Sequence, residues 1–258
     1  MTSQVNRYWR IFGTGLSFSL FGLGGFFLRI LVFPILRLLL WKREVYTKSS
    51  RHIIRFSFKA FIGIMKGLGV LTVTLSGIER LNRQGLLIVA NHPTLLDIVF
   101  LLSLVKHGDC IVKSKLLDNP FTRGPINAAG YIANQQESEL CNDSIISLEK
   151  GSNLIIFPEG TRTPNDGVVR LERGMANIAI RGNYNITPIH IRCTPSALQK
   201  NTKWWQVPPK PMHFEIRVFE DIEIHSFIVK NKNPALAVRE LTNFMQDFFN
   251  KENTNEQT

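Results

Sequence analysis

The sequence predicts an α/β domain with a mixed, largely parallel sheet flanked by helices, preceded by an N-terminal helical membrane anchor. Two observations support this fold class. After residue 70, short runs rich in β-branched residues alternate with longer amphipathic runs, which is typical of alternating strands and helices. Before residue 70, a long apolar run contains few charged residues. We expect anchor helices over 1–70, the α/β domain over 71–250 and a frayed tail over 251–258.

The composition restricts the class of protein. Of the 258 residues, 44% are hydrophobic and 20% charged, a balance that excludes a disordered chain, a collagen-like repeat and a polytopic membrane protein. The three cysteines, Cys110, Cys141 and Cys193, form no C-x-x-C pair, so we expect reduced thiols rather than a disulfide framework. The glycine-rich motifs of nucleotide-binding proteins are absent from the sequence.

The apolar segment at the N-terminus is interrupted. Residues 11–28 are 18 uncharged residues, which as a helix would measure about 27 Å and barely cross a hydrocarbon core. Beyond them, Arg29, Pro34 and Arg37 interrupt the apolar run, which ends at residue 41. A kinked or re-entrant helical pair therefore fits better than a clean span. The first alanine is Ala60, so no A-x-A cleavage site can follow the segment and we expect it to be retained.

Positive charge is concentrated in the same region. Residues 1–70 carry a net charge of +10 with a single acid, Glu44, whereas residues 71–258 carry +1. A basic, apolar segment joined to a nearly neutral domain favours an anionic lipid surface over nucleic acid as the partner. Residues 51–68 predict an amphipathic helix with a basic stripe of Arg51, Arg55, Lys59 and Lys66. Membrane contact is favoured for this helix, and the alternative is a core-facing helix with a solvated stripe.

The remaining elements follow from short patterns. The expected strands are 71–78, 86–90, 110–113, 153–157, 186–191 and 213–219, and the expected helices are 94–106, 137–149, 170–181 and 234–250.

A histidine and an aspartate lie where the strand 86–90 ends. The sequence NHPTLLD places His92 five residues before Asp97, a spacing that one continuous helix would put about 140° out of phase. Pro93 removes the difficulty, because proline suits the first helical position and leaves His92 in the preceding turn, with Asp97 one turn inside the helix. The carboxylate could then orient the ring and leave one nitrogen as a general base. The alternative is a helix-capping or buried histidine.

A second polar cluster, FPEGTR at 157–162, follows the strand 153–157. Open α/β sheets bind ligands at the carboxyl ends of their strands, so both clusters should share one rim. Gly160 permits close approach of the backbone to a ligand, and Arg162 offers a planar fork suited to phosphate. Glu159 could hold a hydroxyl or orient that arginine. A plain β-turn is the alternative for this cluster.

Together, NHPTLLD and FPEGTR resemble the motifs of the glycerolipid acyltransferase superfamily, in particular the bacterial 1-acyl-sn-glycerol-3-phosphate acyltransferases. The resemblance covers residues 70–195 and implies that His92 is the general base, with Asp97 as its orienter. It also implies acceptor binding by residues of both motifs and an acyl-donor region in a short proline block. The implied acceptor-binding residues are Asn91, Glu159, Gly160, Thr161 and Arg162, and the implied donor region is Thr187, Pro188 and Ile189. Lys113, Lys115, Asn119 and Pro120 are similar to the segment between the two motifs.

One departure from the family pattern concerns the acceptor. The family's second block has the form G-x-x-F-I-x-R, but here it is GYIANQQ, so Gln136 stands in place of the arginine that helps to bind glycerol phosphate. Ala133 and Asn134 replace the apolar pair. Arg123 or Arg173 could compensate for the missing arginine. Acceptors without a phosphomonoester, such as a lyso-aminolipid or another lysophospholipid, therefore stay open.

The resemblance implies an enzyme of phospholipid biosynthesis. It would transfer a fatty acyl group from acyl-CoA or acyl-carrier protein to a lysolipid hydroxyl, giving phosphatidic acid from 1-acyl-sn-glycerol-3-phosphate. No cofactor or metal is expected beyond the thioester, because the six histidines show no H-x-H or H-x-x-x-H spacing. The expected location is the inner membrane, with the domain on its cytoplasmic side. A hydrolase is disfavoured because G-x-S-x-G is absent, and a non-catalytic membrane-binding protein is the alternative of another class.

Overall fold

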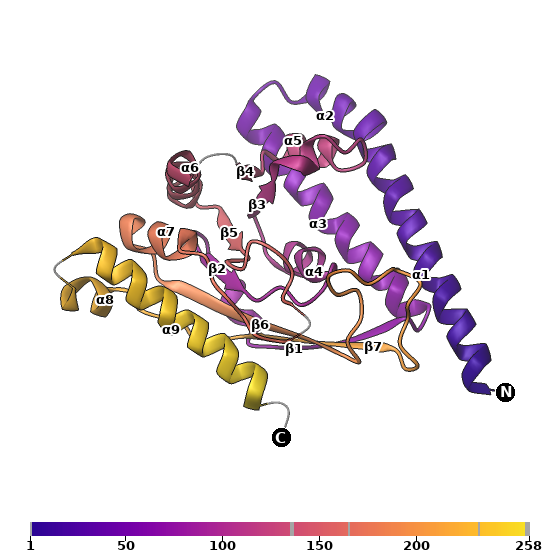
Figure 1. Cartoon of the computed structure of the whole chain (residues 1–258). Helices are drawn as coiled ribbons and strands as arrows, with labels where there is room; N and C mark the ends of the chain where they lie inside the picture. The colour runs from indigo at the N-terminus through magenta and orange to yellow at the C-terminus, as the bar shows by residue number, and fades with distance from the viewer. Residues whose placement is uncertain (1, 135–136, 165, 232, 256–258) are drawn as a thin grey trace.

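The computed structural model describes residues 2–134, 137–164, 166–231 and 233–255, and a seven-stranded sheet lies at its centre (Figure 1). The strand order is β1-β7-β6-β2-β5-β3-β4, and every neighbouring pair is parallel except β6 and β7. The strands are β1 (Leu71–Ser76), β2 (Leu87–Ala90), β3 (Gly108–Lys113), β4 (Ile132–Asn134), β5 (Asn153–Ile156), β6 (Ile186–Thr194) and β7 (Met212–Val218). The expected mixed, largely parallel sheet is therefore confirmed, and β4 is an addition.

Helices cover both faces of the sheet. One side carries α3 (Arg43–Gly67), α4 (Asp97–Leu104) and α5 (Arg123–Ala129), and the other carries α6 (Glu137–Glu149), α7 (Gly174–Gly182), α8 (His225–Lys230) and α9 (Pro234–Asn255) (Figure 1). Alternate side chains of β2 enter the two cores, because Ile88 and Ala90 pack on the α4 side while Leu87 and Val89 pack on the α7 side. This double burial explains the continuous apolar run of β2.

The N-terminal segment is helical but broken, as expected. It consists of α1 (Thr2–Phe27), a π-helical turn η1 (Leu28–Val32) and α2 (Phe33–Leu39), and Pro34 lies in the first turn of α2. Proline lacks the N–H that a continuous α-helix would use, and a π-turn is one way to accommodate the defect. The stretch Asn6–Leu39 is long and apolar enough to cross a membrane, with a mean hydropathy of 2.0 and 6% of its most apolar window buried.

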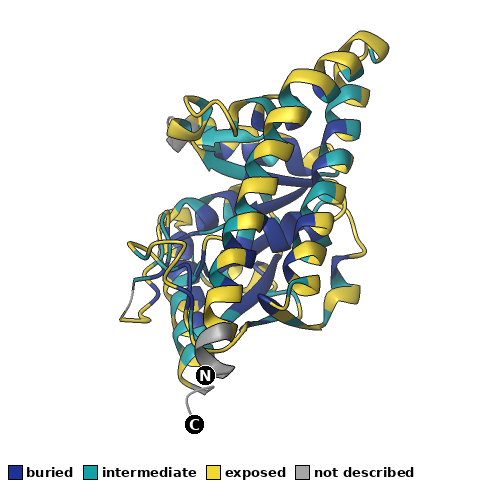
Figure 2. Cartoon of the chain, turned by 90° about the vertical axis from the view of Figure 1, so that its right-hand side faces the viewer, coloured by how far each residue is buried: buried dark blue, intermediate teal, exposed yellow. Residues whose placement is uncertain are grey.

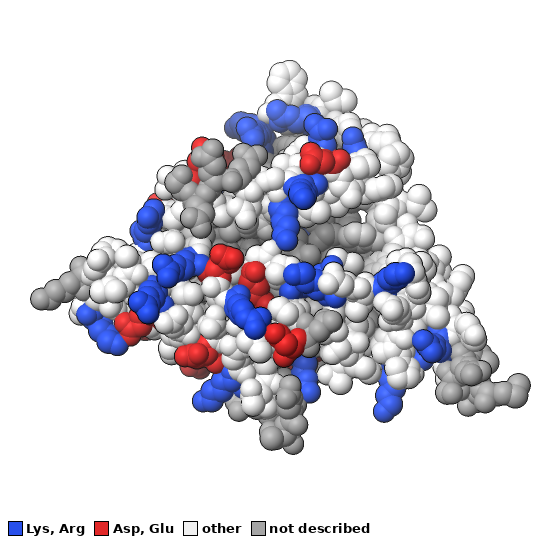
Figure 3. Space-filling model, viewed as in Figure 1, with Lys and Arg blue, Asp and Glu red and all other residues white. Residues whose placement is uncertain are grey.

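The outer surface of this helical segment is apolar. Figure 2 shows exposed residues along the outer helices and buried strands behind them, and Figure 3 shows few charged side chains along the edge formed by α1. The inner side of α1 packs on α3, where Phe21 meets Phe58 and Phe61. Phe61 and Met65 of α3 in turn belong to the same core cluster as the sheet. The helical segment is therefore attached along its length to the α/β domain.

The basic stripe of α3 does not face away from the protein as expected. The Arg51 guanidinium pairs with Asp109 at 2.6 Å and also donates to Ser152 Oγ and the Ala129 carbonyl, and Arg55 donates to the Leu104 carbonyl. These two arginines lie against the α/β domain, whereas Lys59 and Lys66 are exposed. The prediction of a lipid-facing stripe was wrong for its first half, because a buried carboxylate on β3 pairs with it.

Several helices also differ from those expected. Helix α4 begins at Asp97 rather than residue 94. Helix α7 begins at Gly174 because the backbone N–H groups of Val169 and Leu171 donate to side chains of α9. Helix α5 was not expected. The tail expected over 251–258 is helical as far as Asn255, because Glu252 pairs with Arg217 and Asn253 donates to the Gly167 carbonyl. Residues 256–258 lie outside the described residues.

Candidate active site

His92 and Asp97 form a direct pair at the carboxyl end of β2. Strand β2 ends at Ala90, His92 follows in the irregular segment before α4, and its Nδ1 lies 2.8 Å from Asp97 Oδ2. The Asp97 side chain is fully buried, whereas 19% of the His92 side chain is exposed. Since the carboxylate accepts, Nδ1 carries the proton, and within the described part of the chain no group hydrogen-bonds Nε2. The expected pairing is present, with Nε2 placed to take a proton.

Thr94 holds the carboxylate in place, and sequence reasoning did not identify it. Its backbone N–H donates to Asp97 Oδ2 at 2.7 Å and its hydroxyl donates to Asp97 Oδ1 at 2.5 Å. Asp97 is the first residue of α4, not one turn inside a helix begun by Pro93, so the local turn rather than helix phase brings the two side chains together. A threonine three residues before an aspartate was the available signal.

The second motif is joined to the first by hydrogen bonds. Glu159 Oε1 accepts from the His92 backbone N–H at 2.9 Å and from Thr163 Oγ1 at 2.8 Å, and the Thr163 N–H donates to the His92 carbonyl at 2.7 Å. The His92 ring also stacks on Phe157, with centroids 4.2 Å apart. The two strand-end clusters, 67 positions apart in sequence, therefore form one site at one rim of the sheet.

Glu159 keeps one oxygen without a partner. Its Oε2 is buried, and no described donor lies within hydrogen-bond distance. Burial raises the pKa of this carboxyl, and the hydrogen bonds from Thr163 and His92 only partly oppose the effect. An unpaired buried carboxylate oxygen beside the His92 ring is suited to accept a hydrogen bond from a ligand hydroxyl.

Gly160 and Thr161 form the turn after Glu159. The Gly160 N–H donates to the Phe157 carbonyl, and its φ of +62° lies in the left-handed region that favours glycine. Gly160 is exposed and Thr161 is half-buried, so both can be reached from solvent.

Arg162 makes contacts that were not expected. Its Nη1 donates to the carbonyls of Leu198 at 3.0 Å and Gln199 at 2.8 Å, and Glu159 does not orient it. The Leu95 N–H donates to the same Leu198 carbonyl. The arginine therefore fixes the start of the segment between β6 and β7 against the site.

The other expected site residues lie inside the sheet. Asn91 is buried, and its side chain exchanges two hydrogen bonds with the backbone of Ile191, which extends the pairing of β2 with β6. Thr187, Pro188 and Ile189 are buried in β6, where Thr187 donates to Asp221. In this structure these four buried side chains support the rim, and their expected roles in acceptor binding and in the donor region stay predictions.

The expected residues between the two motifs lie on the surface, at and after the end of β3. Lys113, Lys115 and Asn119 are exposed at and after the end of β3, and the Pro120 carbonyl accepts from Arg29 of η1. Arg123 and Arg173, the candidate replacements for the family arginine, are exposed at the starts of α5 and α7. Gln136 lies outside the described residues. Among the residues that the structure describes, no group of three His, Cys, Asp or Glu side chains could hold a metal.

Comparisons with known proteins converge on one family. Residues 72–192 match the family model described as Acyltransferase. The chain is 28% identical over 151 residues to a 1-acyl-sn-glycerol-3-phosphate acyltransferase of Cocos nucifera, covering 54% of this chain and 47% of that protein. It is 30% identical over 147 residues to a putative 1-acyl-sn-glycerol-3-phosphate acyltransferase of Caenorhabditis elegans, covering 52% and 50%. The chain thus spans about half the length of the curated relatives it matches.

A solved structure shows the same fold. The 1-acyl-sn-glycerophosphate acyltransferase PlsC from Thermotoga maritima superposes with a TM-score of 0.73 at 20% identity, covering 99% of this chain and 98% of that one. At this identity the likeness concerns the fold, including the N-terminal helices.

Proposed function

Residues 72–192 of this chain belong to the glycerolipid acyltransferase superfamily, and on that premise we propose that the protein transfers a fatty acyl group from an acyl thioester to a lysolipid hydroxyl. The proposed acceptor is 1-acyl-sn-glycerol-3-phosphate and the product phosphatidic acid. Acyl-CoA or acyl-carrier protein would supply the acyl group, and the reaction needs no further cofactor. The observation that carries the proposal is the His92–Asp97 pair, joined to Glu159 through the His92 backbone.

The proposed chemistry uses the pair as follows. His92 Nε2 takes the proton of the acceptor hydroxyl while the hydroxyl oxygen attacks the thioester carbonyl carbon. The tetrahedral intermediate collapses, the carbon–sulfur bond breaks, and the imidazolium returns the proton to the departing thiolate. The Asp97 carboxylate stabilises the imidazolium, in the way the carboxylate of a catalytic triad does. Holding thioester and acceptor beside one base supplies much of the rate enhancement.

The contacts of Arg162 favour a second class of acceptor. The family assigns this arginine to the acceptor's phosphate, but here Nη1 of its guanidinium donates to two backbone carbonyls. A lysolipid without a phosphomonoester, such as a lyso-aminolipid or another lysophospholipid, would not need a phosphate clamp at this position. We therefore keep such an acceptor as the second candidate, with the same chemistry at His92.

We place the proposed reaction at the cytoplasmic face of the inner membrane. The exposed apolar surface along Asn6–Leu39 supports attachment to a bilayer, and the substrates are lipids that reside there. The alternative of a non-catalytic membrane-binding protein shares this attachment and differs only in the chemistry.

The test is acyl transfer by the purified full-length chain in vesicles. Acyl-CoA and acyl-carrier-protein thioesters are offered with a panel of lysolipids, and His92→Ala is compared with His52→Ala, a change of an exposed histidine on α3. We expect His92→Ala to lower the rate by about 100-fold to 10,000-fold, the usual contribution of a general base, and His52→Ala to leave it unchanged.

The outcomes separate the candidates. Preference for 1-acyl-sn-glycerol-3-phosphate supports the first acceptor, and a His92-dependent reaction that prefers an acceptor without a phosphomonoester supports the second. Thioester consumption that is equal in wild type and His92→Ala would remove His92 from the mechanism. No consumption with any acceptor would favour the non-catalytic alternative.

A further inference from the structure

The segment between β6 and β7 exposes two adjacent tryptophans. Trp204 and Trp205 lie in residues 195–211, which we call the tryptophan loop, and they are 43% and 47% exposed. Their rings meet edge to face, with centroids 5.5 Å apart. Tryptophans bury large areas when a partner is available, so two exposed rings side by side indicate a surface that meets an apolar partner.

The charge of the tryptophan loop restricts that partner. The loop contains Lys200, Lys203 and Lys210, all exposed, and no aspartate or glutamate. The Lys203 ammonium lies 5.1 Å from the ring centroid of Trp205. Aromatic rings interleaved with lysines match the interface of a bilayer, where rings sit at the level of the headgroups and lysines meet anionic lipids.

The loop is held in a defined shape. At its tip, the Gln206 N–H donates to the Lys203 carbonyl and Gln206 Oε1 accepts from the Lys203 N–H, which closes a turn around the tryptophans. At its start, Arg162 binds the Leu198 and Gln199 carbonyls. Near its end, the buried Arg10 of α1 donates to the Pro209 carbonyl at 2.6 Å. The two rings are therefore presented by a fixed support.

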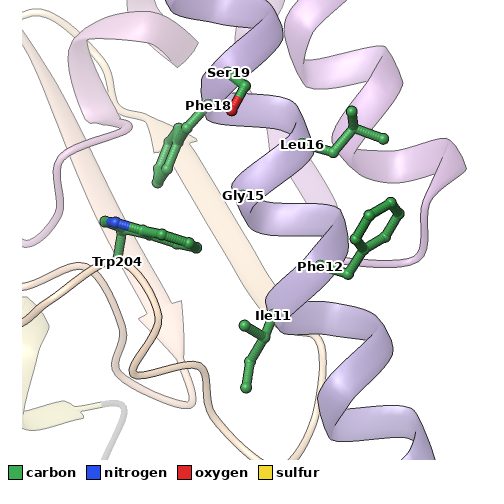
Figure 4. Close-up of a pocket in the computed structure, with 7 residues that line it drawn as sticks. All are labelled: Ile11, Phe12, Gly15, Leu16, Phe18, Ser19 and Trp204. Atoms are coloured by element: carbon green, nitrogen blue, oxygen red, sulfur yellow. The ribbon is translucent and has the colours of Figure 1, made fainter.

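The loop continues the apolar surface of the N-terminal helices. Trp204 packs on α1 at Gly15, where an added Cβ would lie 3.0 Å from its ring. Between the ring and the helix is an open groove of about 510 Å³ (Figure 4). Its lining consists of Ile11, Phe12, Gly15, Leu16, Phe18, Ser19 and Trp204. Phe12 and Leu16 point away from Trp204 in Figure 4 and are exposed, so the apolar surface passes from the loop onto the helix.

We propose that the tryptophan loop is a second membrane-contact element, which lies in the headgroup region of an anionic lipid surface beside α1. This inference rests on the proposed function, because it concerns how the same site reaches its lipid substrate. The partner is a lipid surface because the loop joins the stretch Asn6–Leu39, which has the length and composition of a membrane helix, and because its charges are all positive. A second copy of this chain would bring the same positive charge.

The loop also connects the membrane surface to the active site. The Leu198 carbonyl accepts from Arg162 and from the Leu95 N–H, and Leu95 lies in the turn between His92 and Asp97. Contact of the loop with lipid would therefore hold the rim that carries His92 close to the headgroups. A lipid acceptor could then reach the base without leaving the surface completely.

Tryptophan fluorescence tests the proposal, because the chain has four tryptophans and two of them lie in the loop. The full-length variant Trp9→Phe with Trp41→Phe leaves only the loop rings as reporters, and the matched variant Trp204→Phe with Trp205→Phe leaves only the anchor rings. Both are reconstituted in phosphatidylcholine vesicles with and without phosphatidylglycerol, carrying brominated acyl chains as quenchers. We expect both variants to be quenched, and the loop variant more strongly in the anionic vesicles.

Each other result overturns a defined part of the argument. Quenching of the anchor rings but not the loop rings would show that the loop does not touch lipid, while membrane attachment stands. Absence of quenching in both variants would remove membrane attachment itself, and the proposal with it. Light scattering in detergent gives the oligomeric state, and a dimer that Trp205→Ala dissociates would make a second copy the occupant and overturn the lipid assignment.

The lysines are tested by vesicle sedimentation. Replacing Lys200, Lys203 and Lys210 by glutamine should weaken binding to anionic vesicles roughly 100-fold, since each surface lysine contributes a factor of about 5. The control replaces Lys106, Lys150 and Lys251, three exposed lysines outside the loop, and should change binding less than fivefold. An equal effect of both triple variants would show that only net charge matters and would contradict a specific role of the loop.

Discussion

Replacement of Thr94 by valine tests whether the hold on Asp97 matters for activity. Thr94 and Asp97 are both fully buried, and the Thr94 hydroxyl donates to Asp97 Oδ1 at 2.5 Å. Valine has nearly the shape of threonine, so the change opens no cavity but deletes the hydroxyl, which donates to Asp97 and also accepts from the Leu96 N–H. A hydrogen bond to a charged group contributes about 1.5 to 3 kcal/mol of stabilisation, and solvent cannot replace this bond because both side chains are fully buried. If that energy orients Asp97 against His92, kcat should fall about 10-fold to 100-fold.

The assay follows release of free thiol from an acyl-CoA by the full-length protein in vesicles. We expect the KM values for donor and acceptor to stay within about threefold of wild type, because Thr94 lies behind the carboxylate, and Thr94→Ser to restore kcat because it keeps the hydroxyl. Ser103→Ala is the matched control: it removes a buried hydroxyl from α4, the helix that Asp97 begins, and this hydroxyl donates to the Phe100 carbonyl at 2.7 Å.

The reasoning is refuted by any of three results with folded protein. These are a wild-type kcat for Thr94→Val, a loss in Thr94→Ser as large as in Thr94→Val, or an equal loss of kcat in Ser103→Ala. A melting temperature for each variant separates a loss of orientation from a loss of folded protein.

Two further predictions concern buried or paired carboxyl groups. Burial raises the pKa of Glu159, so the folded state is stabilised when this group is protonated and loses that stabilisation as pH rises through the folded pKa. Glu159→Gln should therefore leave the melting temperature at pH 7 equal to that of wild type or higher. Acyl transfer should fall at least about tenfold, because an oxygen that accepts from the substrate is replaced by an amide group. A lower melting temperature with unchanged acyl transfer would contradict this prediction. The hydrogen bonds from Arg83 hold the pKa of Asp221 below its usual value. The Arg83–Asp221 pair therefore stabilises the fold at pH values above the pKa of Asp221 in the unfolded chain, and this stabilisation is lost as pH falls through the pKa in the folded protein. Asp221→Asn should lower the free energy of unfolding by up to about 1 kcal/mol at pH 7, since the ion pair is partly exposed. Denaturation at pH 7 and pH 3 should show that the difference in free energy between variant and wild type shrinks at pH 3. A difference that stays constant would exclude the ion pair as its cause.

The strands could be predicted because their signal is local. Leu87–Ala90 and Asn153–Ile156 are buried on both faces, which requires an unbroken apolar run of the kind the sequence displays. All six expected strands are present, and the strand that was missed, Ile132–Asn134, has only three half-buried or exposed residues. Helix α7 starts later than expected because Asn250 and Gln246 accept from the backbone of Val169 and Leu171, a contact about 80 positions away that no local pattern encodes.

The pairing of the candidate site residues was predictable from the sequence, but the contacts that support them were not. His92 and Glu159 closely follow the ends of apolar strands, and this position, together with the family resemblance of the two motifs, identified them and Asp97. Asn91 has the same position, yet its side chain completes the pairing of two strands, so its role depends on a partner strand 100 positions later. Arg162 likewise binds carbonyls of a loop whose path the sequence does not reveal.

The contacts that the sequence does not reveal also change the interpretation of the net charge of residues 1–70. The sum of +10 favoured an anionic lipid surface, but several of these charges are directed at the protein. Arg10, Arg29, Arg51 and Arg55 donate to backbone carbonyls or to a buried carboxylate of the α/β domain. Exposed lysines remain at 42, 48, 59 and 66, and the tryptophan loop adds three more. The positive field of the proposed lipid-facing surface therefore comes from lysines on both segments and from the exposed Arg7, Arg37 and Arg43, whereas the other four arginines attach the helices to the α/β domain. Neutralising the loop lysines should for that reason change lipid binding without loosening the fold, and neutralising Arg51 should do the reverse.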